Sequence, residues 1–145
     1  MTSPDATASA GLQDIRGDKD RILRRRWSVI ATLIAIAVFA EAVFAGAMLS
    51  GVDWARGAHA AGATVAIALS LFAGLFAAVS LRGISRGPRL MLMLLSLAVL
   101  LVLQAVIGAL TAKGANLVWL HVPLGVALFA FARQAITAAS RLQLE

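Results

Sequence analysis

Residues 90–112 read LMLMLLSLAVLLVLQAVIGALTA, and no charged side chain interrupts them. An α-helix needs about 20 consecutive apolar residues to cross the roughly 30 Å of hydrocarbon in a bilayer. Inside lipid no water satisfies the backbone amides, so a spanning chain forms a helix whose hydrogen bonds are internal. The stretch therefore predicts a transmembrane helix.

Three similar apolar runs lie elsewhere in the chain, at about 27–49, 55–81 and 117–135. The links between the four runs are short and contain glycine. Links this short join antiparallel neighbours, so the expected fold class is all-α, a transmembrane four-helix bundle with up-down-up-down topology over residues 21–140. Trp27, Trp54 and Trp119 lie at the ends of these runs and are interpreted as interfacial anchors.

Composition favours a membrane protein and excludes several other classes. Hydrophobic residues make up 61% of the 145-residue chain and charged residues 14%, whereas a soluble domain carries about 25% charged residues. The absence of cysteine excludes disulfides, thiolate metal sites and cysteine nucleophiles. The net charge of +6 comes from basic residues clustered between the apolar runs, which is typical of topology signals. The expected partner is thus the lipid bilayer and not nucleic acid.

The placement of lysine and arginine predicts the orientation of the chain. Most basic residues precede the first run, lie in the middle link or lie toward the end of the chain: Arg16, Lys19, Arg21, Arg24, Arg25, Arg26, Arg82, Arg86, Arg89, Arg133 and Arg141. The other two connections hold only Arg56 and Lys113. Because basic loops stay in the cytoplasm, we expect both termini there, in a multi-pass protein of the cell (plasma) membrane. Residues 1–20 are polar without apolar periodicity and are expected to form a disordered cytoplasmic tail.

Polar groups inside a bilayer are costly, and four lie within the expected helices, toward the outer half of the membrane: Glu41, His59, Gln104 and His121. They form a repeat. EAVFAGAML begins at Glu41 and QAVIGALTA begins at Gln104, and a histidine follows after 18 and 17 residues respectively. The two helical hairpins run in the same sense, so this is a parallel internal repeat. Such a repeat would bring both histidines to the same depth, on opposite sides of a shared space.

The two histidines are candidate ligands of a cofactor. Each is followed by a small residue on its own helical face, Gly62 after His59 and Gly125 after His121, which would leave room beside the imidazole. Two opposed histidines across a bundle are the usual axial ligands of a b-type haem. We therefore predict a haem b whose iron is bound by His59 and His121, with Arg56 placed to neutralise a propionate.

Plainer interpretations of the same residues remain open. A histidine near a membrane interface often hydrogen-bonds a neighbouring helix, and glycine often lets membrane helices approach closely. Glu41 could carry protons, orient a ligand or simply hydrogen-bond a neighbouring helix. The two histidines favour the ligand interpretation because they are the only ones in the chain and occupy equivalent positions of the repeat.

The second hairpin resembles a known family. QAVIGAL at 104–110, followed by HVPLG at 121–125, is similar to the helix 3–helix 4 pattern in each half of haem A synthase. That family has two fused four-helix halves, each with a histidine on its second and fourth helices near the outer face. The resemblance covers residues 27–135. It implies that His59 and His121 are the haem-ligand pair and that Glu41 and Gln104 approach the ligand cavity.

The chain also departs from this family. It corresponds to one half rather than two, and it lacks the family's outer-loop cysteine pair. The family's catalytic glutamate lies just before the helix 2 histidine, whereas DWARGA at 53–58 contains no glutamate. The resemblance therefore implies a haem-binding half rather than haem A synthesis.

The leading prediction is a cytochrome b-like, haem-binding membrane protein that transfers electrons or carries haem within a larger membrane redox complex, and is not an enzyme on its own. Bis-histidine ligation fills both axial positions, which favours electron transfer over oxygen activation. A homodimer would imitate the eight-helix architecture of the family. Two alternatives stay open: a small proton-coupled transporter that uses Glu41, and a cofactor-free accessory subunit of a membrane complex.

Overall fold

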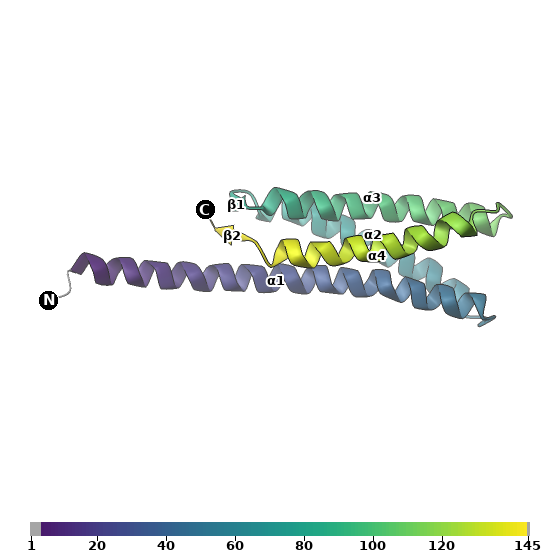
Figure 1. Ribbon diagram of the computed structural model, residues 1–145, viewed down its shortest axis with the longest axis horizontal. Coiled ribbons are helices and arrows are strands. Elements are labelled where there is room, and N and C mark those ends of the chain that lie inside the picture. The colour runs from purple at the N-terminus through teal and green to yellow at the C-terminus, as the bar shows by residue number, and fades with distance from the viewer. Residues whose placement is uncertain (1–3, 145) are drawn as a thin grey trace.

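Four long helices joined by short connections make up the fold (Figure 1). The computed structural model describes residues 4–144, with side chains from Gln13 onward. The helices are α1 (Pro4–Leu49), α2 (Ala55–Ser80), α3 (Gly87–Ala112) and α4 (Val118–Ala139). Two short strands, β1 (Ile84–Ser85) and β2 (Gln143–Leu144), pair antiparallel at the end of the bundle from which α1 projects.

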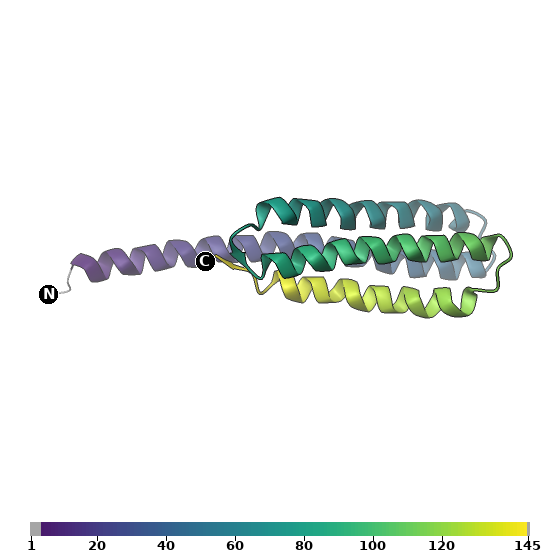
Figure 2. The same cartoon turned by 90° about the horizontal axis from the view of Figure 1, so that it is seen from above.

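The helices are arranged as a ring. Both α1 and α3 pack against α2 and α4, while within the described residues the pairs α1/α3 and α2/α4 lie diagonally opposite and make no close backbone contact. Successive helices run in opposite directions, as Figure 2 shows from above. The predicted all-α, up-down-up-down four-helix bundle is confirmed.

The outside of the bundle is apolar. All four helices are long and apolar enough to cross a membrane. Large apolar side chains lie exposed along their outer faces, among them Phe72, Val99 and Val126. Contact of this surface with water would cost free energy in proportion to its area, whereas contact with lipid does not. The chain is therefore a multi-pass membrane protein whose surroundings are a lipid bilayer.

The two hairpins turn in the same way. Gly51 between α1 and α2 has φ of 81°, and Gly114 between α3 and α4 has φ of 101°. Only glycine adopts this left-handed backbone without a steric penalty from Cβ. The matching turns agree with the parallel repeat of two hairpins that the sequence predicts.

Helix α1 begins earlier than the sequence analysis expects. Residues 1–20 were expected to form a disordered tail, whereas the helix in the structure starts at Pro4. Seven of these twenty residues are alanine, leucine, glutamine, lysine or arginine, which favour helices, and a helix already formed in the membrane can propagate into the segment. Arg16 Nη2 donates to the Leu144 carbonyl at 3.1 Å and Leu144 N donates to Asp20 Oδ1 at 2.7 Å, so β2 is bound to this extension.

Trp27 lies inside the bundle. It is only 3% exposed, and its ring stacks on Phe76 with 5.6 Å between centroids. The interpretation of Trp27 as an interfacial anchor is therefore wrong, because its face of α1 turns toward α2. Trp54 and Trp119 are exposed near the opposite end of the bundle, as that interpretation requires of them.

The buried apolar core occupies the half of the bundle nearer the β1–β2 pair. In α1 the buried positions end at Val38, and in α4 they begin at Leu128. In the other half of the bundle, which carries the α1–α2 and α3–α4 links, Ala55 and Ile107 are the only buried apolar residues within the described part of the chain. The other half of the bundle thus lacks a continuous, fully buried apolar core.

Candidate functional site

Four polar side chains lie in this half of the bundle, and each helix contributes one. They are Glu41 from α1, His59 from α2, Gln104 from α3 and His121 from α4. All four are partly buried. The parallel repeat thus brings together the residues that the sequence analysis singled out.

Glu41 and His59 form a close pair between α1 and α2. Glu41 Oε2 lies 2.9 Å from His59 Nδ1, and the two side chains are 13% and 24% exposed respectively. This is an ion-pair contact, and His59 Nδ1 and both carboxylate oxygens have no hydrogen-bond partner among the described residues. Gly62 makes room for the pair, because a Cβ at this position would overlap Glu41 Oε1.

Gln104 takes the corresponding place between α3 and α4. Its Nε2 donates a hydrogen bond of 2.8 Å to the backbone carbonyl of His121. A Cβ at Gly125 would lie 3.2 Å from Gln104 Nε2, so a glycine again faces the polar side chain of the neighbouring helix. The second hairpin therefore repeats the first with an amide in place of the carboxylate, and its bond goes to the backbone rather than to the imidazole.

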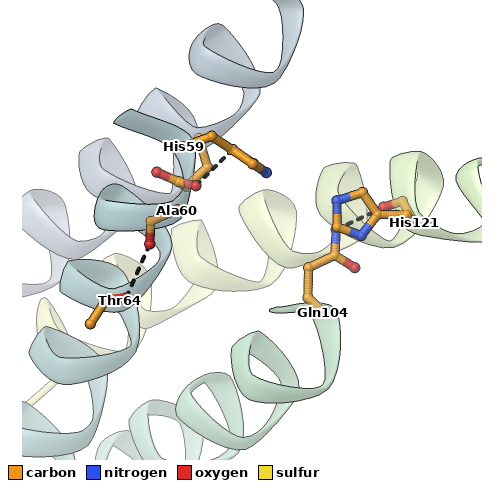
Figure 3. A network of polar contacts seen from close by, with 6 residues as sticks. His59, Ala60, Thr64, Gln104 and His121 are labelled. Atoms are coloured by element: carbon orange, nitrogen blue, oxygen red, sulfur yellow. Dashed lines mark hydrogen bonds and ion pairs between the residues drawn. The ribbon is translucent and has the colours of Figure 1, made fainter. Parts of the chain in front are cut away.

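The rings of His59 and His121 meet across the centre of the bundle, since α2 and α4 are diagonally opposite. Their centroids are 6.3 Å apart and their planes lie at 85° to each other. In Figure 3 the far edge of the His59 ring points toward His121. Gly108 of α3 lies beside the second ring, where a Cβ would be 2.9 Å from His121 Cε1.

This arrangement offers metal-binding and proton-accepting groups without internal partners. His121 Nδ1 and Gln104 Oε1 also lack hydrogen-bond partners in the described part of the chain. Buried polar atoms are rarely left unpaired, because each costs desolvation free energy. Two imidazoles and a carboxylate can together bind a cofactor or exchange protons.

No family model, curated protein or solved structure matches this chain. Over the residues whose side chains are described, no group of three or more histidine, cysteine, aspartate or glutamate residues is placed to hold a metal ion. Haem ligation needs only two protein ligands, so a two-histidine site does not require such a group.

The remaining predicted site residues divide into two groups. Gly62 and Gly125 lie within the site, but the space beside them is filled by Glu41 and Gln104. Arg56 is exposed, and within the described residues it makes no ion pair with Glu41 or any other carboxylate. The sequence analysis missed the role of Gly108. Gly108 could have been identified from its position four residues after Gln104, because that spacing places both residues on the same face of the helix.

Proposed function

We propose that this chain is a b-type haem-binding membrane protein, similar to one half of a haem A synthase, in which His59 and His121 hold the haem iron. The observation that carries this proposal is the position of the two rings on diagonal helices. Metal–imidazole bonds are about 2.0–2.1 Å long, so two imidazoles that shared one metal atom would have centroids up to about 6.5 Å apart. The 6.3 Å separation lies within that range.

The packing around the rings also supports the proposal. The apolar core ends at about the level of Val38 and Leu128, so the rings lie where few side chains are fully buried. Gly108 leaves the edge of the His121 ring free of side-chain bulk from α3. A planar cofactor needs such a region between helices.

Glu41 acts in this proposal as a positioning residue. Its carboxylate contacts His59 at Nδ1, which leaves Nε2 as the ring nitrogen available to a ligand. Metal-bound histidines commonly have their other ring nitrogen held by a carboxylate or carbonyl, which sets the tautomer and orientation of the ring. His121 instead has its backbone held by Gln104, so its ring is oriented through the helix.

The proposed activity is electron transfer, alone or as the haem-carrying subunit of a membrane redox complex or a homodimer. A haem held by His59 and His121 would supply one-electron chemistry, and ligation by two histidines favours electron transfer over oxygen activation. We further propose that both termini lie in the cytoplasm and that the chain resides in the plasma membrane. The basic residues at the end of the bundle that carries β1 and β2 support this orientation.

The test is an absorption spectrum of detergent-purified protein after haem supplementation. We expect a Soret band and a sharp α-band on reduction, both lost in His59→Ala and in His121→Ala. Asn116→Ala, an exposed change at the same end of the bundle, should retain both bands. If wild-type protein shows no Soret band, or if both histidine variants keep the wild-type spectrum, the proposal fails.

The contact between Glu41 and His59 favours a second candidate, a proton-coupled transporter. Two titratable groups in contact within a membrane segment are typical of proton relays. In proteoliposomes carrying a pH gradient and a pH-sensitive dye, this candidate predicts proton flux that Glu41→Gln abolishes. The haem proposal predicts no such flux and a Soret band that survives in Glu41→Gln.

A further inference from the structure

A second polar feature lies at the opposite end of the bundle from the histidines. A pocket of about 120 Å³ opens between the start of α3 and the end of α4. Its polar or charged lining residues are Arg86, Arg89, Gln134, Thr137 and Arg141, and two apolar residues, Met93 and Ala138, complete the lining. A cavity of this volume can hold a group the size of several water molecules.

The pocket carries a concentrated positive charge. Arg86, Arg89 and Arg141 all line it, and no acidic residue does. Among the described residues none of the three forms an ion pair. Three guanidinium groups around one small space repel each other unless an anion lies between them. The pocket therefore has the charge of an anion site.

The backbone places these arginines together. The pairing of β1 with β2 sets Ser85 opposite Gln143, so Arg86 directly follows one paired strand and Arg141 closely precedes the other. Arg89 lies in the first turn of α3, whose N-terminal amides have no side-chain cap. Unsatisfied amides at a helix N-terminus add a partial positive charge.

We propose that this pocket binds the phosphate of an anionic phospholipid from the leaflet at this end of the bundle. Arginine forks match phosphate oxygens in geometry and charge, and basic pockets between membrane helices bind anionic headgroups. Gln134 and Thr137 offer neutral donors and acceptors to a polar headgroup, while Met93 gives the pocket an apolar side. Its neighbour Leu92 lies exposed on the outer surface of α3, along which an acyl chain can lie. A lipid joins these two environments in one molecule.

The test compares lipids on the full chain purified in a neutral detergent. Native mass spectrometry and thermal melting are measured with phosphatidylglycerol, with phosphatidylcholine and with inorganic phosphate. We expect retention of phosphatidylglycerol and a raised melting temperature, with neither effect from phosphatidylcholine or free phosphate. The triple change R86Q/R89Q/R141Q should weaken phosphatidylglycerol binding by about a hundredfold, since each arginine near an anionic lipid contributes about fivefold.

A matched control removes the same charge elsewhere at this end of the bundle. R24Q/R82Q/R133Q changes three arginines that do not line the pocket, and should bind phosphatidylglycerol as the wild type does. Equal losses in both triple variants would show a general charge effect and overturn the proposal, as would equal retention of phosphatidylcholine. A melting shift with inorganic phosphate as large as with phosphatidylglycerol would assign the pocket to a free anion and overturn the lipid assignment. If the pocket variant loses its helical circular dichroism, the single change Arg89→Gln, with an expected loss of about fivefold, replaces it.

Discussion

Gly62 lies so close to the Glu41 carboxylate that a Cβ at residue 62 would overlap Oε1. Phe44 closes the same space, with its Cε2 atom 3.4 Å from that Cβ position. Glu41 therefore reaches His59 only because α2 has no side chain at this point. The first half of the candidate site depends on the close approach of α1 and α2 at a glycine.

Replacing Gly62 with alanine should displace Glu41 and separate it from His59. Adding a methyl group to a closely packed site costs about 1–3 kcal/mol, so we expect the free energy of unfolding to fall by that amount. Unfolding in detergent micelles, followed by circular dichroism, measures it. Gly57→Ala is the control on the same helix: nothing lies within 4 Å of its Cβ position, and alanine should be neutral or stabilise by up to about 1 kcal/mol. Equal effects of the two changes would contradict the packing argument.

Gly108 should matter to the second histidine in a similar way. In Gly108→Ala the new Cβ would lie 2.9 Å from His121 Cε1 and should rotate the imidazole away from His59. We expect haem affinity, measured by titration of the Soret absorbance, to fall about tenfold or more. Gly46→Ala in α1, where nothing lies within 4 Å of the Cβ position, should leave haem affinity unchanged. A tenfold loss in Gly46→Ala as well would remove the assignment of Gly108 to the site.

Glu41→Gln should change the properties of the haem without removing its ligands. Loss of a negative charge next to a histidine ligand disfavours the oxidised iron, so the reduction potential should rise by about 60 mV, a tenfold change for one electron. A spectroscopic redox titration measures this shift. Asp53→Asn removes an exposed carboxylate from the same end of the bundle and should leave the potential within experimental error. An unchanged potential in Glu41→Gln would mean that the carboxylate does not act on the cofactor through His59.

Trp27 should contribute strongly to stability because it is buried and stacks on Phe76. Replacing a buried tryptophan with alanine costs about 3–5 kcal/mol, and we expect Trp27→Ala to lower the free energy of unfolding by this amount. Trp119→Ala, at an exposed position, should change it by less than about 1 kcal/mol. Equilibrium unfolding in detergent compares the two, and a larger loss in Trp119→Ala would contradict the burial of Trp27.

The proposed orientation can be tested with single cysteines, because the chain has none of its own. Asn116→Cys and Ser140→Cys place a thiol at exposed positions at opposite ends of the bundle. A membrane-impermeant maleimide applied to intact cells should label residue 116, and label residue 140 only after permeabilisation. The reverse pattern would place the termini outside the cytoplasm.

The sequence alone determined the number, approximate limits and lipid environment of the helices. Uninterrupted apolar runs such as 90–112 leave little choice, because in a bilayer the backbone must satisfy its own hydrogen bonds. The repeat of Glu41 and Gln104 also predicted which polar residues gather at one level. By contrast, the hydrophobic pattern of the sequence did not predict that α1 extends back to Pro4. A helix that propagates from the membrane into a polar segment shows no apolar periodicity there.

The tertiary structure decided which face of each helix turns inward, and with that the chemistry of both ends of the bundle. Trp27 at the start of an apolar run looked like an anchor, yet only the packing of α1 on α2 shows it to be buried. Two other features also depend on residues that are distant in the chain but close in the fold. They are the contact of Glu41 with His59 and the arginine pocket between α3 and α4. The sequence shows how apolar a segment is, but in a membrane helix the face toward lipid and the face toward the bundle are both apolar. Small residues and polar contacts between helices determine which face turns toward the bundle.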